Sequence, residues 1–245
     1  AYLKLPKATR NKTLADLALH NIRVTKQTLK FCEDNNLNYR ISSSLIPLES
    51  LPEANFVLEE SYNWVEIQAE FELCKQIIKR ANIRCSTHPD QFVVPASMNQ
   101  AVVKKAMFEL NLHGKLMDLF GLSSDYHSPI NIHMNCYKGS TLKDTASRFC
   151  ETFDVLNDNV KSRLVLENED KPNSWDVLEL YDNIYKKIQI PITYDSHHFR
   201  LNNKKGLEPQ EAFDLAKSTW GKHTPLFHFS NGKLSKTDKA HSSFV

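Results

Sequence analysis

The chain has 245 residues and a nearly balanced charge, with 31 Lys and Arg against 29 Asp and Glu. Its 41% hydrophobic and 24% charged residues are typical of a globular protein, and 6 Gly and 10 Pro exclude a collagenous or low-complexity chain. No apolar run approaches the length of a membrane span, and the first residues lack the apolar stretch of a signal peptide. We expect a single globular domain over residues 1–245 with no membrane partner. The net charge of +2 lacks the strong basic excess of many nucleic-acid binders.

The chain has five cysteines, an odd number, and no two of them form a CxxC pair. This pattern favours reduced thiols in a cytoplasm-like compartment over a disulfide framework. The predicted location is therefore the cytoplasm, either of a bacterium or of the host cell of a virus.

Helical and extended patterns alternate along the chain. Apolar residues at helical spacing predict helices over residues 14–31, 64–78, 102–119, about 141–158, about 174–187 and about 208–220. Short β-branched runs predict strands at 39–41, 83–87, 130–132, 164–166, 190–194 and 226–227. Such a series predicts an α/β fold with parallel strands, either doubly wound or a TIM-type (β/α)8 barrel. No GxGxxG or GxxxxGK[ST] string is present, which argues against the doubly wound nucleotide-binding folds and against a nucleotide cofactor.

Histidines and carboxylates stand where the predicted strands end. In a parallel barrel all these ends open on one face, where barrel enzymes hold their active sites. The residues expected there, including one in the C-terminal tail, are His88, His133, Glu167, Asp195, His198, His228 and His241. His197 is the alternative to His198, which we prefer because its spacing of three from Asp195 lets both side chains point inward.

Imidazole and carboxylate together suit Zn²⁺, Mn²⁺ or Fe rather than Mg²⁺ or Ca²⁺. Seven such groups exceed the ligand set of one ion, so the pattern predicts two or three divalent ions, as in enzymes that catalyse displacement at phosphorus. Taken singly, a strand-end histidine is more often structural, and Glu167 lies in an acidic string that fits a solvated turn equally well. The joint placement of these groups favours metal binding.

Five strings along the chain resemble the UV damage endonuclease family. They are THPDQFVVPAS at 87–97, LENE at 166–169, DSHH at 195–198, AHS at 240–242 and YRISSSLIP at 39–47. The resemblance implies a barrel related to apurinic endonucleases and xylose isomerases. It also implies an enzyme that uses Mn²⁺ in a multinuclear site, or another divalent ion such as Zn²⁺. Such an enzyme nicks double-stranded DNA immediately 5′ of cyclobutane dimers and 6-4 photoproducts, leaving a 3′-hydroxyl and a 5′-phosphate.

The resemblance also assigns roles to residues. The seven strand-end and tail residues match metal ligands that position a catalytic water, and Gln91 and Phe92 match a pair that probes the lesion. An amide can hydrogen-bond where a base is displaced, and an aromatic ring can stack in the gap. Without the resemblance, Phe92 fits a core position equally well.

The chain departs from the family pattern at several places. Ser44 stands where relatives have a His or Asp ligand, and Leu226 stands where some have a modified lysine. The first and last strands of the barrel are expected to lie outside the given chain, so that the barrel over 1–245 is truncated at both ends.

Basic side chains near the same face are candidates for contact with DNA phosphates. They are Arg200, Lys204, Lys205, Lys233, Lys236 and Lys239, of which Arg200 and Lys233 are the preferred pair. No preference for a base sequence is expected, because lesion recognition depends on deformability and extrusion.

Three other functions stay open at this point. A sugar isomerase or epimerase, or an apurinic endonuclease, of the same barrel class would also use histidines and carboxylates on divalent ions. A damage-binding protein without catalysis is a further alternative. Gln91, Phe92 and the lysine-bearing loops favour DNA over a small sugar, and we expect a monomer.

Overall fold

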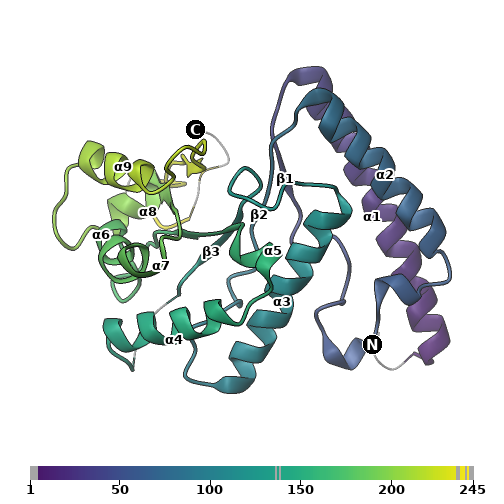
Figure 1. The fold of residues 1–245 in the computed structure, drawn as a ribbon, viewed down its shortest axis with the longest axis horizontal. Coiled ribbons are helices and arrows are strands. Elements are labelled where there is room, and N and C mark those ends of the chain that lie inside the picture. Colours follow the sequence, from purple (N-terminus) through teal and green to yellow (C-terminus); the bar gives the residue numbers. More distant parts are fainter. Residues whose placement is uncertain (1–4, 136, 138, 236–237, 241, 243–245) are drawn as a thin grey trace.

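The computed structural model describes residues 5–135, 137, 139–235, 238–240 and 242 (Figure 1). Its centre is a sheet of six strands, all parallel, in the order in which they occur along the chain. The strands are β1 (Tyr39–Ile41), β2 (Cys85–Thr87), β3 (Ile130–His133), β4 (Leu164–Glu167), β5 (Ile192–Asp195) and β6 (Phe227–His228). A doubly wound sheet would reverse its strand order at one point. The sequential order therefore confirms the barrel class.

Helices precede β1 and connect each pair of neighbouring strands. The longer ones are α1 (Lys7–Asn35), α2 (Trp64–Ala81), α3 (Gln100–Leu119), α4 (Leu142–Asp154) and α9 (Pro209–Ser218). The shorter ones are η2 (Pro52–Ala54), η3 (Leu58–Glu60), α5 (Asp158–Lys161), α6 (Val177–Leu180), η4 (Tyr181–Tyr185), α7 (Lys186–Ile188) and α8 (Ser196–Leu201). No helix of the described part of the chain is long and apolar enough to cross a bilayer.

Side-chain contacts show that the sheet is strongly curled. In a flat sheet β2 and β6 would lie four strand spacings, or about 19 Å, apart. Yet the rings of His88, just after β2, and His228, at the end of β6, are 6.0 Å apart. At the other end of the same strands, Arg84 donates to the carbonyls of Thr224 and Pro225, at 2.7 and 3.0 Å. The six strands therefore form an arc of a barrel that brings both ends of β2 close to β6.

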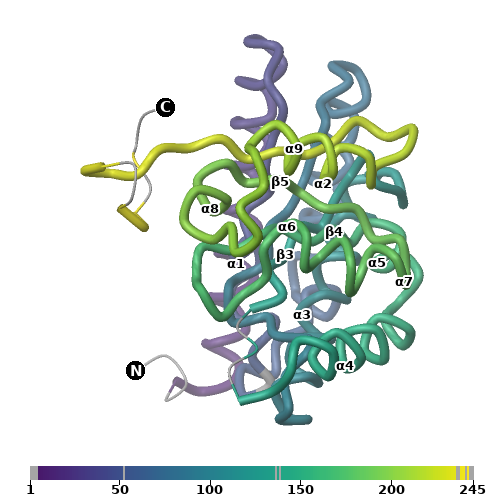
Figure 2. The backbone as a smooth tube through the Cα atoms, turned by 90° about the vertical axis from the view of Figure 1, so that its left-hand side faces the viewer, coloured from purple at the N-terminus to yellow at the C-terminus, as the bar shows by residue number. Residues whose placement is uncertain are grey.

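Two groups of buried apolar residues pack around this arc. One joins α1, α2, β1 and β2, where the two long helices lie side by side at one end of the molecule (Figure 1). The other joins β3, β4 and β5 with the helices that follow them, and Trp175 is fully buried in it. In Figure 2 the yellow C-terminal segment projects away from the body of helices. Among the described cysteines, Cys32, Cys74, Cys85 and Cys150 are free; Cys136 lies outside the described residues.

Three connections between strands differ from the prediction made from the sequence. The helix expected at about 141–158 is broken between Asp154 and Asp158, which lets both Leu156 and Val160 turn into the core. The helix expected at about 174–187 begins only at Val177, where Asp176 forms a capping box with Glu179, and it contains the π-helical turn η4. The short helix α8 was not predicted, because six mostly polar residues carry no apolar periodicity.

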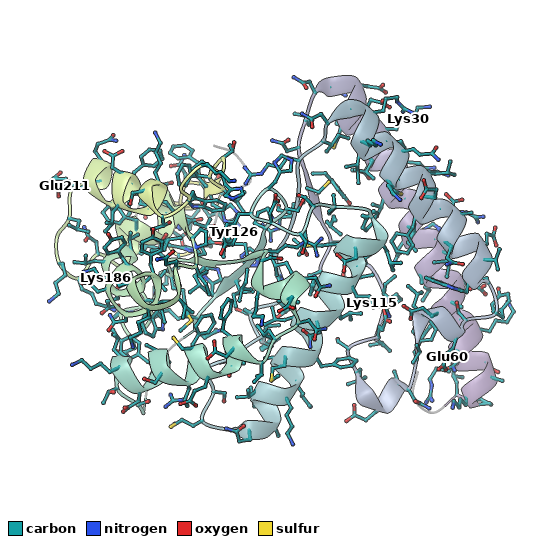
Figure 3. The ribbon with its side chains drawn as sticks, in the orientation of Figure 1. Lys30, Glu60, Lys115, Tyr126, Lys186 and Glu211 are labelled. Carbon is teal, nitrogen blue, oxygen red and sulfur yellow. The ribbon has the colours of Figure 1, made fainter. Side chains whose placement is uncertain are left out.

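The segment after β1 is held against α3 by an ion-pair cluster. Lys115 of α3 (Figure 3) lies 3.3 Å from the carboxylate of Glu49 and 2.6 Å from that of Glu59. Burial raises the pKa of Glu49 in spite of this lysine. The cluster fixes the base of the loop whose first residues, 42–44, lie near the carboxyl ends of the strands.

Candidate metal centre

Glu167, the last residue of β4, lies at the centre of the polar cluster. Its side chain is buried, with the residue 1% exposed, so the interpretation as a solvated acidic turn is wrong. The Oε2 atom lies 3.1 Å from His88 Nε2 and 3.9 Å from His133 Nε2, and Oε1 lies 2.9 Å from His228 Nδ1. Residues at the carboxyl ends of β2, β3, β4 and β6 therefore meet around Glu167.

Two overlapping triads share this carboxylate. One consists of His88, His133 and Glu167, and the other of Glu167, Asp195 and His228; within each, the potential ligand atoms lie within 4.8 Å of one another. The imidazole and carboxylate donors in both triads are those that bind transition-metal ions such as Zn²⁺ and Mn²⁺.

Asp195 is oriented by the helix that the sequence did not reveal. It is the last residue of β5 and also the N-cap of α8, where its Oδ1 accepts hydrogen bonds from the backbone N–H of His197 and His198 at 2.7 and 2.8 Å. Its other oxygen, Oδ2, lies 3.9 Å from His228 Nδ1. The cap thus leaves Oδ2 directed toward the cluster.

The two adjacent histidines of α8 occupy different environments. His198 lines the cavity over the cluster, and its ring lies 5.4 Å from that of His133. His197 is fully buried beside Arg200. The structure therefore brings six of the seven expected ligands together, with His198 rather than His197 among them; His241 lies outside the described residues.

Protonation in the cluster follows from burial and from the central carboxylate. Burial alone would raise the pKa of Glu167, but hydrogen bonds from His228 and His88 and the charge of His133 hold this pKa well below its usual value. Burial lowers the pKa of His133 to about 4. Burial also acts against protonation of His228, but its hydrogen bond to Glu167 raises the His228 pKa overall. At neutral pH the cluster thus holds an ionised glutamate and a neutral His133, as metal ligation requires.

The donor set of this structure fits divalent metal ions. Among the described residues, His133 Nδ1 and Asn131 Oδ1 are buried and have no hydrogen-bond partner. Buried polar atoms are normally satisfied, so each of these two atoms can still accept a hydrogen bond from a water molecule, while His133 Nε2 is the ring atom that faces Glu167. The residues that would hold the ions are His88, His133, Glu167, Asp195, His198 and His228.

Two asparagines that the sequence analysis did not assign support the ligands. The Asn168 side chain accepts from the backbone N–H of Asp195 at 2.8 Å and donates to its carbonyl at 3.1 Å, which ties the end of β4 to the end of β5. The Asn168 carbonyl lies 2.9 Å from His198 Nδ1. Asn131 donates a hydrogen bond to Glu167 Oε2. The only sequence signal was the presence of Asn168 in the LENE string.

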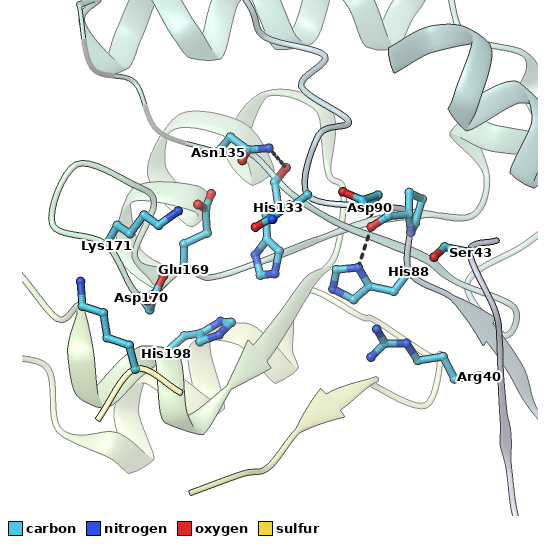
Figure 4. A pocket seen from close by; sticks show the side chains of 13 residues that line it. Arg40, Ser43, His88, Asp90, His133, Asn135, Glu169, Asp170, Lys171 and His198 are labelled. Carbon is cyan, nitrogen blue, oxygen red and sulfur yellow. Dashed lines mark hydrogen bonds between the residues drawn. The ribbon is translucent and has the colours of Figure 1, made fainter. Parts of the chain in front are cut away.

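A cavity of about 460 Å³ opens above the cluster (Figure 4). Its wall includes His88, His133 and His198 together with residues that sequence reasoning missed as site residues, namely Arg40, Ser43, Asn135, Glu169, Asp170 and Lys171. Glu169 is 6% exposed, and burial raises its pKa to about 8. This carboxyl group is therefore largely protonated near neutral pH.

Gln91 and Phe92 form the tip of a tight turn beside this cavity. Asp90 closes the turn, because its Oδ1 accepts from the N–H of Phe92 at 3.1 Å and its carbonyl accepts from the N–H of Val93 at 3.0 Å. Val93 is buried and anchors the turn, whereas Phe92 is 78% exposed. The alternative of core packing for Phe92 is therefore wrong, and Gln91 lines the cavity itself.

The basic candidates differ in how free their side chains are. Arg200 donates to the carbonyl of Ser230 at 2.7 Å, and Lys204 is paired with Glu179 at 2.6 Å and with the carbonyl of Ser174. Lys233 is exposed, while Lys239 lines the cavity. The structure thus places Lys239, and not the preferred Lys233, in the wall of the cavity, and Lys236 lies outside the described residues.

The two residues that depart from the family pattern line two different cavities. Ser44 is exposed and shares a 3.3 Å hydrogen bond with Ser42, in a loop beside the turn that carries Phe92. Leu226 precedes β6 and lines a smaller cavity with Arg40 and His228.

A curled parallel sheet with histidines and carboxylates at its carboxyl ends places this chain among the TIM-barrel proteins, with a donor set at the strand ends that could hold divalent ions. The family model described as UV-endonuclease UvdE matches residues 1–245 of this chain. The UV DNA damage endonuclease of Nostoc sp. (strain PCC 7120) is 32% identical over 252 residues, covering 100% of this chain and 74% of that protein. The chain therefore belongs to the UvdE family, and the predicted resemblance is confirmed.

Solved structures agree with this assignment. The crystal structure of SacUVDE superposes with a TM-score of 0.83 at 28% identity, over 99% of this chain and 78% of that one. Endonuclease IV from Thermus thermophilus gives a TM-score of 0.51 at 13% identity, over 70% of this chain and 67% of that chain. At this low identity the second match shows a shared fold alone.

Proposed function

We propose that this protein is a metal-dependent DNA repair endonuclease that nicks the backbone of double-stranded DNA immediately 5′ of ultraviolet photoproducts. The observation that carries the proposal is the convergence of two triads of potential metal ligands on Glu167, beside the exposed turn of Gln91 and Phe92, in a chain of the UvdE family. The relatives named UV DNA damage endonuclease support the choice of substrate.

Divalent ions, Mn²⁺ by our proposal, would activate water and neutralise charge on the phosphate when bound at the triads. The chain's own residues prepare the site for this chemistry. The neutral His133 and the ionised Glu167 offer lone pairs rather than protons, and the α8 cap directs Asp195 Oδ2 toward the cluster. His241 is proposed as a further ligand on the resemblance alone.

The exposed turn supports damaged DNA as the substrate. Phe92 presents an aromatic ring to solvent, next to an amide that lines the cavity. A ring so placed can stack in the gap left by a displaced base, and Gln91 can hydrogen-bond to the opposite strand. A sugar epimerase would have no use for such a turn, so the turn favours DNA over a small sugar.

Mapping of cleavage on end-labelled duplexes tests the proposal. Irradiated and mock-treated oligonucleotides are incubated with the protein and Mn²⁺, and each product is compared with a sequence ladder. We expect one cut directly 5′ of the photoproduct and a 3′-hydroxyl end that a polymerase can extend. His88→Ala should abolish this cut while the circular dichroism spectrum stays unchanged. Equal cutting of both duplexes, or a cut elsewhere, would contradict the proposal.

A further inference from the structure

We propose that Arg40 binds a phosphate of the DNA strand that is cut at this centre. The inference rests on the proposed function and adds to it a substrate contact that lies outside the metal ligands. Arg40 is the middle residue of β1 and is exposed, whereas Ile41 beside it is 4% exposed. Because successive side chains of a strand point to opposite faces, Arg40 faces the inside of the arc.

The position of Arg40 joins two cavities at the cluster. It lines the cavity of about 460 Å³ with His88, and it also lines an adjoining cavity of about 280 Å³ with His228. Figure 4 shows its guanidinium pointing into the space below His88.

Within the described part of the chain, the Arg40 side chain has no hydrogen bond and no ion pair. Two other arginines of the barrel differ in this respect. Arg84 donates to four main-chain carbonyls at 2.7 to 3.3 Å, and the buried Arg163 donates to four at 2.8 to 3.4 Å. Glu167, the central anion, already accepts from His88, His228 and Asn131. No carboxylate of the described residues pairs with Arg40, so its charge is available to an anion of the substrate.

A phosphodiester fits this requirement. Guanidinium presents parallel N–H groups that match two oxygens of one phosphate, and it keeps its charge at any pH at which the protein is folded. A strand holds such a group more rigidly than the loops that carry Lys233 and Lys239. In contact with the phosphate at the cluster, Arg40 would orient it and stabilise the negative charge that develops during displacement.

The test combines three variants with a change in the substrate. Arg40→Gln removes the charge, Arg40→Lys keeps it, and Arg80→Gln is the control. Arg80 is a surface residue of α2 that pairs with Glu33 at 2.6 Å. The substrate is a duplex with one cyclobutane dimer, either with all its phosphates or with an uncharged methylphosphonate at the cut position mapped for the wild type. The rate of nicking in Mn²⁺ and the Kd in EDTA are measured.

We expect Arg40→Gln to lower kcat about 10²-fold, Arg40→Lys to restore part of it, and Arg80→Gln to stay within about twofold of wild type. The methylphosphonate should weaken binding by the wild type about tenfold and by Arg40→Gln hardly at all, because the charge pair is already lost. If the methylphosphonate weakened binding equally in both proteins, or if Arg40→Gln nicked within twofold of wild type, the role of Arg40 would be overturned but the proposed function would not. A wild type that does not nick the dimer duplex would overturn the proposed function as well.

Discussion

The two ends of the barrel strands use polar side chains in opposite ways. At the amino end, Arg84 and Arg163 direct their guanidinium groups to main-chain carbonyls, and Arg163 is fully buried. At the carboxyl end, histidines, carboxylates and Arg40 surround open cavities, and buried atoms such as His133 Nδ1 have no partner among the described residues. The hydrogen-bonded side chains at the amino end stabilise the arc of strands. The polar groups at the carboxyl end that have no such partner are available to ligands.

The largest effect is expected for the carboxylate shared by both triads. Glu167→Gln keeps the shape of the side chain but removes its charge, so we expect nicking to fall by about 10³-fold or more, equivalent to about 4 kcal/mol of activation free energy. Single-turnover nicking in Mn²⁺ measures the loss, and thermal unfolding checks that the variant is folded. If the variant kept more than a tenth of wild-type activity, the carboxylate of Glu167 would not be required for nicking.

At the amino end of the strands we expect a loss of stability of comparable size, without a loss of nicking activity. Arg163→Met removes one donor from each of four carbonyls and from Asp118, so we expect the free energy of unfolding to fall by about 3 kcal/mol. Urea unfolding measures the loss. Nicking per folded molecule should stay within about twofold of wild type, and a selective loss of activity would break the contrast between the two ends.

Stability of the metal-free protein should depend on the protonation of Glu169. Burial raises its folded pKa to about 8, against 4.5 for the unfolded chain. Between these two pH values the folded state keeps a proton that the unfolded state releases. The contribution of protonated Glu169 to the free energy of unfolding is therefore fully present below pH 4.5 and is lost as the pH rises through 8. Glu169→Gln should remove the loss, making the variant more stable than wild type at pH 8 by about 4 kcal/mol. Parallel stability curves for the two proteins from pH 5 to 8 in EDTA would contradict this.

A smaller effect is expected for Asn168, which orients two ligands. Asn168→Ala should weaken Mn²⁺ binding about 10- to 100-fold, as measured by calorimetry, because Asp195 and His198 lose their support. Asn203→Ala is a matched control, since the Asn203 side chain also bonds both the N–H and the carbonyl of one residue, Leu207, at 3.0 and 2.8 Å. Equal metal affinity in Asn168→Ala and the control would show that the support is dispensable.

The smallest change in stability is expected at the exposed turn. Phe92→Ala should alter the free energy of unfolding by less than about 0.5 kcal/mol, because the ring is 78% exposed. The same variant, and Gln91→Ala, should bind irradiated over undamaged duplex less selectively. An unchanged ratio of the two Kd values would argue against a role of the turn in finding lesions.

Much of the architecture could be predicted from local patterns. The β-branched runs and the helical spacing between them predicted six strands in the correct places, because each of these signals lies within a few consecutive residues. The ends of the strands then indicated where His88, Glu167 and Asp195 belong. Helix α8 was missed for the same reason, since its start depends on a cap by Asp195 rather than on apolar periodicity.

The identity of the supporting residues required three-dimensional contacts. Nothing in the spacing of Asn168 showed that its side chain bonds to Asp195, 27 positions away, or that Arg40 shares a cavity with His228. The exposure of Phe92 was equally open, because an aromatic residue before Val93 fits a core as well as a surface turn.

The sequence by itself determined the α/β alternation, the family and the types of donor atom at the strand ends, because these depend on residue type and local order. Only the tertiary structure decided which of these atoms meet and which guanidinium groups are already satisfied. The physical reason is the curvature of the sheet, which brings β2 and β6 together across a distance that no local pattern encodes.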